Sequence, residues 1–331
     1  MLAVGVSMLD VPVPSARPTI ICLLGMHRSG TSVVARLLNL LGVYLGPPEH
    51  LLRPGADNPR GYWENQRLFH VNKRILARFG GDWREPPSFP PGWQCAPGLE
   101  DLRQSASAIV AEEFGNAPVW GWKDPRTCLT LPFWQDLLPP MRYVICVRHP
   151  QSVARSLERR NRGFPPERGV YLWAAYLKAA LACTEGEPRI IVSYEEIMND
   201  WRPGVQALAA FLGEPWRAEE EDLQDAVGSF ISPDLRHHLP AADWLEEGRP
   251  EAEKAFRLAQ ETYESLREHG ARSTEGLVQK LGVALEILAT EVRRLKGTRS
   301  KKVYPTRVDQ RGARDADPGV RDVHPVGPGS V

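Results

Sequence analysis

A continuous apolar run at residues 19–25, TIICLLG, leads directly into a glycine-containing loop and then into a helical pattern that stops at Gly42. The run is rich in β-branched residues and lacks polar alternation, which is typical of a strand buried on both faces. Further strands are expected within 117–126, 141–150 and 188–197, and the last two precede helical patterns. Strands that alternate with helices predict an α/β fold with three layers and a mainly parallel central sheet.

The bulk composition excludes several classes of protein. Lys+Arg and Asp+Glu number 41 each, so the net charge indicates neither a nucleic-acid partner nor a membrane surface. The five cysteines form no C-x-x-C pair, and no apolar segment reaches the roughly 18 residues of a membrane span. His237 and His238 are adjacent but have no third ligand nearby, so we expect no metal site. We expect a cytoplasmic protein.

The 331 residues suit one α/β domain with extensions. We expect a flexible lead-in at 1–18, a domain at 19–272, a C-terminal helix at 273–296 and a disordered tail at 297–331. Long irregular stretches at 43–66, 80–98 and 213–250 are expected to form functional loops. The C-terminal helix carries an apolar stripe that either packs on its own domain or forms the seam of a homodimer.

The loop sequence LLGMHRSGTS, residues 23–32, indicates a phosphate site. Gly25 and Gly30 have the spacing of the nucleotide-triphosphatase loop G-x-x-x-x-G-K-[ST], but Thr31 stands where the lysine is required. Backbone N–H groups and the helix dipole can still bind a phosphate there, and Arg28 can grip it with two hydrogen bonds. Such a site suits a single terminal phosphate better than a triphosphate with its metal ion.

Two further groups of polar residues follow later strands. Arg148 leaves the strand within 141–150, and Ser156 lies eight residues on in the next helix, so both can face one anion. Lys123, in the string GWKDPR, ends another strand. Because ligands of open α/β sheets bind at the carboxyl ends of the strands, we expect these residues to share one cleft with the loop.

Together the strings GMHRSGTS (25–32), KDPR (123–126) and VRHPQSVARS (147–156) resemble the sulfotransferases that use 3′-phosphoadenosine 5′-phosphosulfate (PAPS), in particular the branch of tyrosylprotein, carbohydrate and bacterial enzymes. The resemblance covers roughly residues 19–215 and implies a P-loop-NTPase-like fold. It implies that Arg28 and the loop hold the 5′-phosphate, that Arg148 and Ser156 hold the 3′-phosphate, and that Lys123 stabilises the leaving oxygen. Adenosine 3′,5′-bisphosphate (PAP) would be the product, and no metal is required. The donor-binding residues implied in this way are His27, Arg28, Ser29, Gly30, Thr31, Ser32, Arg148 and Ser156.

An acceptor hydroxyl must lose its proton to a general base. Glu64, in the string NPRGYWENQRLFH, follows two aromatic residues that would raise its pKa, and relatives carry a base glutamate in a comparable place. Glu64 could instead cap the helix that starts near Asn65. His27 and His70 are the other candidates for the base. The predicted catalytic residues are Glu64, Lys123 and Arg28.

The acceptor class is less defined than the donor. The branch of the family suggests a carbohydrate, a glycolipid or another small molecule. Residues 230–249, with Arg236, Trp244 and Arg249, are candidates to cover the adenine. Two alternatives are an atypical small-molecule or nucleotide kinase, and a non-catalytic nucleotide-binding protein that associates through its C-terminal helix.

Overall fold

The computed structural model describes residues 18–55, 58–161, 164–231, 249–271 and 274–299. The predicted lead-in at 1–18 and the predicted tail at 297–331 therefore lie almost wholly outside the described residues. Arg236, His237, His238 and Trp244 also lie outside them.

The core of the fold is a parallel sheet in the order β2-β1-β3-β4, so β1 and β3 are neighbours at its centre. The strands are β1 (Thr19–Leu24), β2 (Val119–Lys123), β3 (Arg142–Val147) and β4 (Arg189–Ser193). Side chains of β1 alternate between two hydrophobic clusters: Ile20, Cys22 and Leu24 enter one, and Ile21 and Leu23 the other. This alternation confirms the predicted α/β fold with a mainly parallel central sheet buried on both faces.

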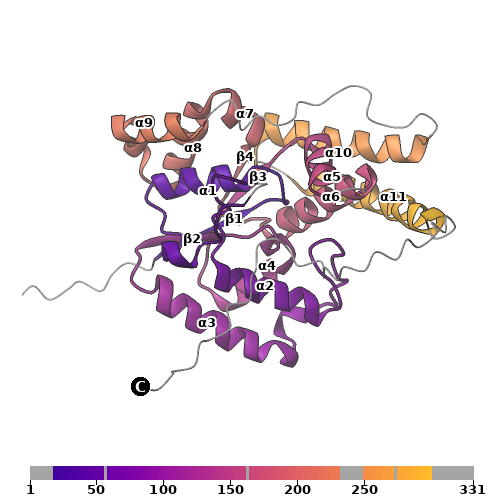
Figure 1. Cartoon of the computed structure of the whole chain (residues 1–331), viewed down its shortest axis with the longest axis horizontal. Helices are drawn as coiled ribbons and strands as arrows, with labels where there is room; N and C mark the ends of the chain where they lie inside the picture. Colours follow the sequence, from indigo (N-terminus) through magenta and orange to yellow (C-terminus); the bar gives the residue numbers. More distant parts are fainter. Residues whose placement is uncertain (1–17, 56–57, 162–163, 232–248, 272–273, 300–331) are drawn as a thin grey trace, which may run out of the picture.

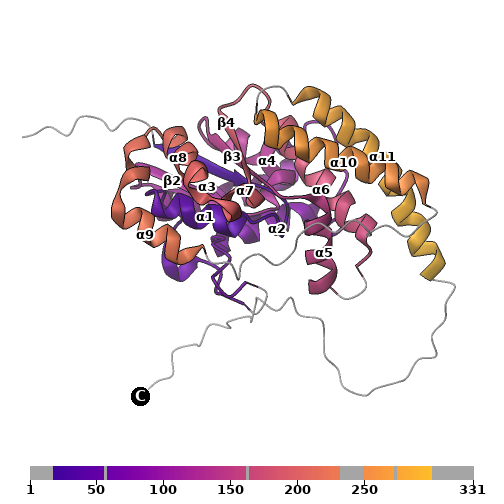
Figure 2. The same ribbon diagram turned by 90° about the horizontal axis from the view of Figure 1, so that it is seen from above.

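Helices form the two outer layers, as Figures 1 and 2 show. The helices are α1 (Thr31–Leu40), α2 (Gln66–Arg78), α3 (Glu100–Phe114), α4 (Thr127–Leu137), α5 (Pro150–Arg160), α6 (Pro166–Cys183), α7 (Tyr194–Asn199), α8 (Trp201–Leu212), α9 (Glu221–Phe230), α10 (Pro250–His269) and α11 (Glu275–Arg299). The short 3₁₀ helices are η1 (Pro48–His50), η2 (Trp93–Cys95), η3 (Pro97–Leu99) and η4 (Pro215–Glu219). One layer contains α1, α7, α8 and α9, and the other contains the remaining α-helices.

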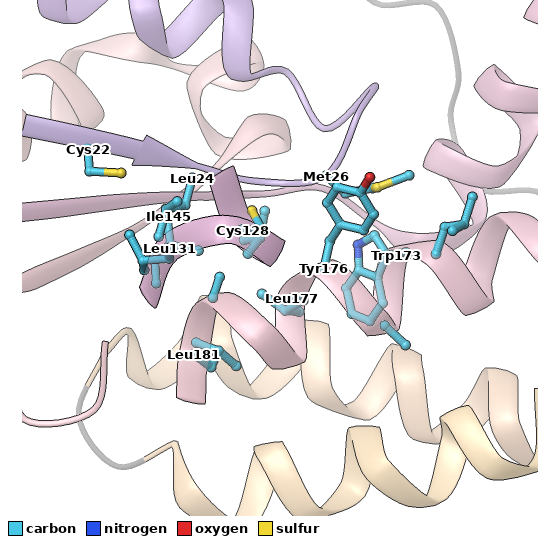
Figure 3. Packing of buried hydrophobic residues seen from close by; sticks show 14 of the residues in the cluster. Cys22, Leu24, Met26, Cys128, Leu131, Ile145, Trp173, Tyr176, Leu177 and Leu181 are labelled. Atoms are coloured by element: carbon cyan, nitrogen blue, oxygen red, sulfur yellow. The ribbon is translucent and has the colours of Figure 1, made fainter. Parts of the chain in front are cut away.

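The larger layer is held by aliphatic, aromatic and sulfur side chains packed between the sheet and α6. Figure 3 shows Leu24 of β1 and Ile145 of β3 near Leu131 of α4 and Leu177 of α6. All of these side chains are at most 5% exposed. This packing fixes the carboxyl ends of β1 and β3, from which the candidate site is built.

The helix α11 spans Glu275–Arg299, in the region where a C-terminal helix is expected at 273–296. Its stripe residues Leu277, Leu281, Ala284 and Leu288 are buried, and α11 packs on α6 and α10 of the same chain. The stretch 213–250 was expected to be irregular, and this prediction is wrong in part because it contains α9. Only Leu223 and Val227 of α9 are buried, which explains the weak apolar pattern.

Among the described residues, no helix is both long enough and apolar enough to cross a membrane.

Candidate active site

The loop after β1 turns the chain into α1 through three residues with positive φ. Gly25 and Gly30 have φ angles of 148° and 89°, and Arg28, which is not a glycine, has 69°. A Cβ atom on Gly30 would lie 2.2 Å from Cδ2 of Tyr194, so a larger residue does not fit there. α1 has no side-chain cap and no acidic residue in its first turn. Its N-terminal N–H groups and dipole are therefore suited to an anion.

Arg28 and Arg148 are in direct contact, although 120 residues separate them. Nη1 of Arg148 donates a hydrogen bond to the backbone oxygen of Arg28 at 3.0 Å. Nε of Arg28 donates to Oγ of Ser156 at 2.8 Å. The guanidinium of Arg148 also lies over the ring of Tyr194, 4.4 Å from its centroid. Hydrogen bonds thus join the loop, the end of β3 and the helix α5 at one place that carries two arginines.

Buried polar atoms without a hydrogen-bond partner gather at this place. Among the described residues, such side-chain atoms belong to His27, Ser29, Trp63, Glu64, Arg148 and His149. Arg148 contributes two such atoms, Nε and Nη2, and the residue is only 5% exposed. A buried charged group with unused donors is costly unless a ligand completes its hydrogen bonds. The two unused donors of Arg148 therefore indicate a binding site for an anion.

Lys123 and Glu64 form a buried ion pair beside the loop. Nζ of Lys123, at the end of β2, lies 2.5 Å from Oε1 of Glu64 and 3.4 Å from Oγ of Ser32. The two residues are 2% and 7% exposed. Oε2 of Glu64 has no partner among the described residues. One carboxylate oxygen is therefore held by the lysine, and the other is available to a ligand.

The backbone around Glu64 is unusual. Trp63 has a φ of 63°. Among the described residues, Trp63 and Arg28 are the non-glycine residues that have a positive φ. The helix α2 is capped by Asn65, whose Oδ1 accepts hydrogen bonds from the N–H groups of Arg67 and Leu68. Glu64 is therefore not the cap, and its side chain is free of that structural role.

Burial and charge act against each other on Glu64. Burial is the larger effect and raises the pKa of its carboxyl above the usual range, while the charge of Lys123 and its hydrogen bond oppose that rise. Glu64 thus holds its proton to a higher pH than an exposed glutamate. A raised pKa suits a carboxylate to accept a proton near neutral pH.

The side chain of His27 is neutral because its pKa is lowered. Burial, followed by the charges of Arg126, Arg160 and Lys123, lowers the pKa of His27 well below its usual range. Its ring lies 4.7 Å from that of Trp83, between centroids, and its Nε2 is buried without a partner among the described residues. The ring is therefore an imidazole that can donate or accept a hydrogen bond, and cannot add to the positive charge of the site.

Most of the predicted residues line one cavity of about 120 Å³. Those lining it are His27, Arg28, Gly30, Thr31, Ser32, Glu64, Lys123 and Arg148. Ser156 accepts a hydrogen bond from Arg28, and Ser29 is a buried residue of the loop whose backbone oxygen accepts one from Sγ of Cys146. His70 is not among the lining residues; its ring packs edge-on against Phe69. Arg249, at the start of α10, pairs with Glu167 at 2.6 Å.

Sequence reasoning missed three contributors. Asn58 donates to Oγ of Ser32 at 3.0 Å and to the backbone oxygen of Gly61 at 2.7 Å, which ties the segment before Glu64 to the loop. Arg160, at the end of α5, also lines the cavity. Arg126 is buried over the ring of Phe69 at 4.3 Å and pairs with Asp124 at 3.1 Å. The string KDPR contained Arg126, but nothing in it distinguished a buried arginine from a surface one.

Comparison with known proteins gives a family for the chain. The model of the sulfotransferase family Sulfotransfer_3 matches residues 18–218. No curated protein matched. One similar solved structure is the sulfotransferase domain of the Synechococcus PCC 7002 olefin synthase, which has 15% sequence identity and a TM-score of 0.40. The match covers 84% of this chain and 97% of that chain. A sulfotransferase from Alicyclobacillus acidocaldarius has 19% identity, coverage of 67% and 95%, and a TM-score of 0.37.

A third similar structure is retinol dehydratase in complex with androsterone and inactive cofactor PAP, with 15% identity, 67% of each chain covered and a TM-score of 0.36. At these values the structural likeness alone establishes no relationship. The family model, in contrast, covers more than half of the 331 residues and includes the loop, Glu64, Lys123, Arg148 and Ser156. The chain therefore belongs to the sulfotransferase family.

Proposed function

We propose that this protein transfers a sulfuryl group from PAPS to a hydroxyl group of a small molecule or glycan and releases PAP. The observation that carries the proposal is the contact between Arg28 and Arg148, which makes two anion-binding elements continuous. A donor with phosphate groups at two ends of one adenosine needs both elements at once. The buried pair of Lys123 and Glu64 supplies the acid–base groups beside them.

On the donor side, Arg28 and the N-terminus of α1 would bind the 5′-phosphosulfate. Arg148 would bind the 3′-phosphate through Nε and Nη2, which have no partner among the described residues. Ser156 would connect the site of the 5′-phosphosulfate with that of the 3′-phosphate, because its Oγ already accepts a hydrogen bond from Arg28. This division predicts that donors lacking a 3′-phosphate bind weakly.

The chemical step needs no redox partner. The acceptor oxygen forms a bond to sulfur while the bond from sulfur to the bridging oxygen of the donor breaks. Glu64 would take the proton of the acceptor hydroxyl, and Lys123 would donate a hydrogen bond to the bridging oxygen as negative charge develops there. Loop N–H groups and Arg28 would hold the phosphate of the product. The proton thus ends on Glu64, and the sulfuryl group on the acceptor.

The ion pair suggests how the donor prepares the base. In the structure Nζ of Lys123 is only 2.5 Å from Glu64. A donor whose bridging oxygen draws Nζ away would remove the nearest positive charge from a buried carboxylate, and the pKa of Glu64 would rise further. Glu64 would then be a stronger base when the donor is bound than when the site is empty.

Thermal unfolding with PAP, PAPS, adenosine 5′-phosphosulfate and ATP with magnesium tests the donor. A ligand at a hundred times its Kd adds about 2.7 kcal/mol to the free energy of unfolding. We expect a rise in Tm with PAP and PAPS and a much smaller one with the other two. A larger rise with ATP and magnesium would instead favour the kinase alternative.

Turnover is tested by incubating the protein with sulfur-labelled PAPS and a cell extract. The appearance of a labelled small molecule or glycan that depends on the active protein supports the proposal and identifies the acceptor class. Binding of PAP without transfer to any acceptor would favour the non-catalytic alternative.

A further inference from the structure

Behind the segment that carries Glu64 lies a second buried carboxylate, that of Glu113, near the end of α3. The side chain of Glu113 is 2% exposed. Its Oε2 accepts a hydrogen bond from Nδ2 of Asn65 at 2.6 Å, and its Oε1 accepts one from Nη1 of Arg67 at 2.8 Å. Nδ1 of His50 lies 2.8 Å from the same Oε1. Glu113 does not line the cavity. Two of its partners, Asn65 and Arg67, closely follow Glu64 in the chain, and the third, His50, is the last residue of η1.

The segment needs such support because its own backbone is strained. The positive φ of Trp63 costs about 1–3 kcal/mol and persists only when surrounding contacts hold it. On one side, the backbone oxygen of Glu64 accepts from the N–H of Leu52 at 2.8 Å. On the other side, Asn65 is fixed by Glu113. Gly46 allows this close approach, since a Cβ there would lie 2.8 Å from Nδ2 of Asn65.

Asn65 therefore has two separate functions. Its Oδ1 caps α2, and its Nδ2 is the donor to Glu113. The cap sets where α2 begins, whereas the bond to Glu113 sets where the residue after Glu64 lies relative to α3. Because Glu113 is 49 positions from Glu64 in the sequence, this second link is a tertiary contact that α2 alone cannot replace.

We propose that Glu113 is a positioning residue: it anchors Asn65 and Arg67 and thereby holds the carboxylate of Glu64 in place beside Lys123. The inference rests on the proposed function of Glu64 as the base. A displacement of about 1 Å can cost a hundredfold in rate when a group must meet its substrate in one geometry. Loss of the anchor should therefore lower kcat while the donor site, built on β1 and β3, keeps its affinity.

Asn65→Ser is the sharpest variant, because serine is also a good helix cap but cannot donate to Glu113 as the amide does. We expect kcat to fall about tenfold to a hundredfold, with the Kd for PAP within about threefold of wild type. Glu113→Gln retains one acceptor for Asn65 and should lose less kcat than Glu113→Ala. Glu112→Ala is the matched control, since Glu112 also contacts Arg67 but its side chain is 63% exposed.

The pattern across these variants decides the inference. Equal loss of PAP affinity and kcat in Asn65→Ser would indicate a general structural defect and overturn the positioning role, as would unchanged kcat. If Glu113→Ala does not fold, the comparison of kcat with PAP affinity is made in Asn65→Ser and Glu113→Gln instead. Amide hydrogen exchange provides a readout independent of turnover. Protection of the Leu52 N–H, which donates to the backbone oxygen of Glu64, should fall in Asn65→Ser and Glu113→Gln but not in Glu112→Ala, while β1 stays protected.

Failure of the proposed function would look different. If Glu64→Gln turns over at the wild-type rate, Glu64 is not the base, and the proposed mechanism falls whatever Glu113 does. If Glu64→Gln is inactive but Asn65→Ser and Glu113→Ala keep full kcat and exchange protection, only the positioning inference falls.

Discussion

Arg28 and Arg148 stand just beyond the ends of neighbouring parallel strands, whereas Glu64 stands in an irregular stretch between η1 and α2. The first pair is placed by β1 and β3, whose register is fixed by the sheet. Glu64 is placed by side chains from distant elements: Lys123 of β2, and Glu113 of α3 through Asn65. Secondary structure fixes the geometry of the half of the site that contains Arg28 and Arg148, whereas tertiary contacts fix the geometry of the half that contains Glu64.

This difference predicts how each half responds to substitution. A sheet remains ordered when one arginine beyond a strand end is removed, so changes on the donor side should act mainly through the lost interaction. The segment at Glu64 contains the strained Trp63 and a buried ion pair, so changes there should affect the rate steeply. The four variants below test this contrast, in order of decreasing expected effect.

Glu64→Gln should have the largest effect, a fall in kcat of about 10²–10⁴-fold, because it removes the general base. The pKa of Glu64 is raised by burial, so in the wild type the rate should increase with pH through a value above the usual carboxylate range. The glutamine variant should lose this acid-side dependence. The measurement is kcat as a function of pH for both proteins. A retained pH dependence in the variant would transfer the role of base to His27, whose pKa is lowered.

Lys123→Ala should lower kcat by about 10²–10³-fold, because the leaving oxygen loses its hydrogen-bond donor. The same change leaves Glu64 buried without its partner, and its proton then stays bound to still higher pH. We therefore expect an upward shift of the acid limb in addition to the lower rate. Titration with PAP is the control, and its Kd should remain close to that of wild type. A large loss of PAP affinity would mean that Lys123 acts in binding rather than in the chemical step.

Much of the fold could be predicted from sequence because buried parallel strands leave a strong local pattern. The four strands fall within the predicted ranges, and Gly42 and Pro150 mark the end of α1 and the start of α5. The helix α4 is not among the predicted elements; Pro132 lies inside it, and proline in a helix interior normally disrupts the helix. Burial of Leu131, Phe133 and Trp134 outweighs that local cost.

For the site, sequence motifs placed Arg28, Lys123 and Arg148 at strand ends, which have a recognisable position in an α/β sheet. Glu64, in an irregular stretch, was a candidate through its aromatic neighbours and the family resemblance. The structure brings these four residues to one cavity. Glu113 lies in an ordinary helical sequence, EEF, where nothing separates it from the exposed Glu112. Which of two adjacent glutamates is buried depends on how α3 packs on α2, and that contact is set by the whole fold.

Arg148→Ala should weaken PAP binding by about tenfold to a hundredfold, since a hydrogen bond to a charged group contributes about 1.5–3 kcal/mol. The loss should be much smaller for adenosine 5′-phosphosulfate, which has no 3′-phosphate. Isothermal titration with both nucleotides measures the difference. Equal losses for the two would contradict a role at the 3′-phosphate and point to a collapse of the loop, because Arg148 also supports the backbone of Arg28.

Ser156→Ala should have the smallest effect, about twofold to tenfold in PAP affinity, because the hydroxyl supports Arg28 and the charge of Arg28 itself stays in the site. Its Oγ accepts from Nε of Arg28, so the change removes one tether of a side chain that the loop and β3 still hold. Ser229→Ala, on the exposed face of α9, is the control. A loss in kcat for Ser156→Ala comparable to that of Glu64→Gln would contradict the contrast drawn above, because the donor side would then be as sensitive to a single contact as the segment that carries Glu64.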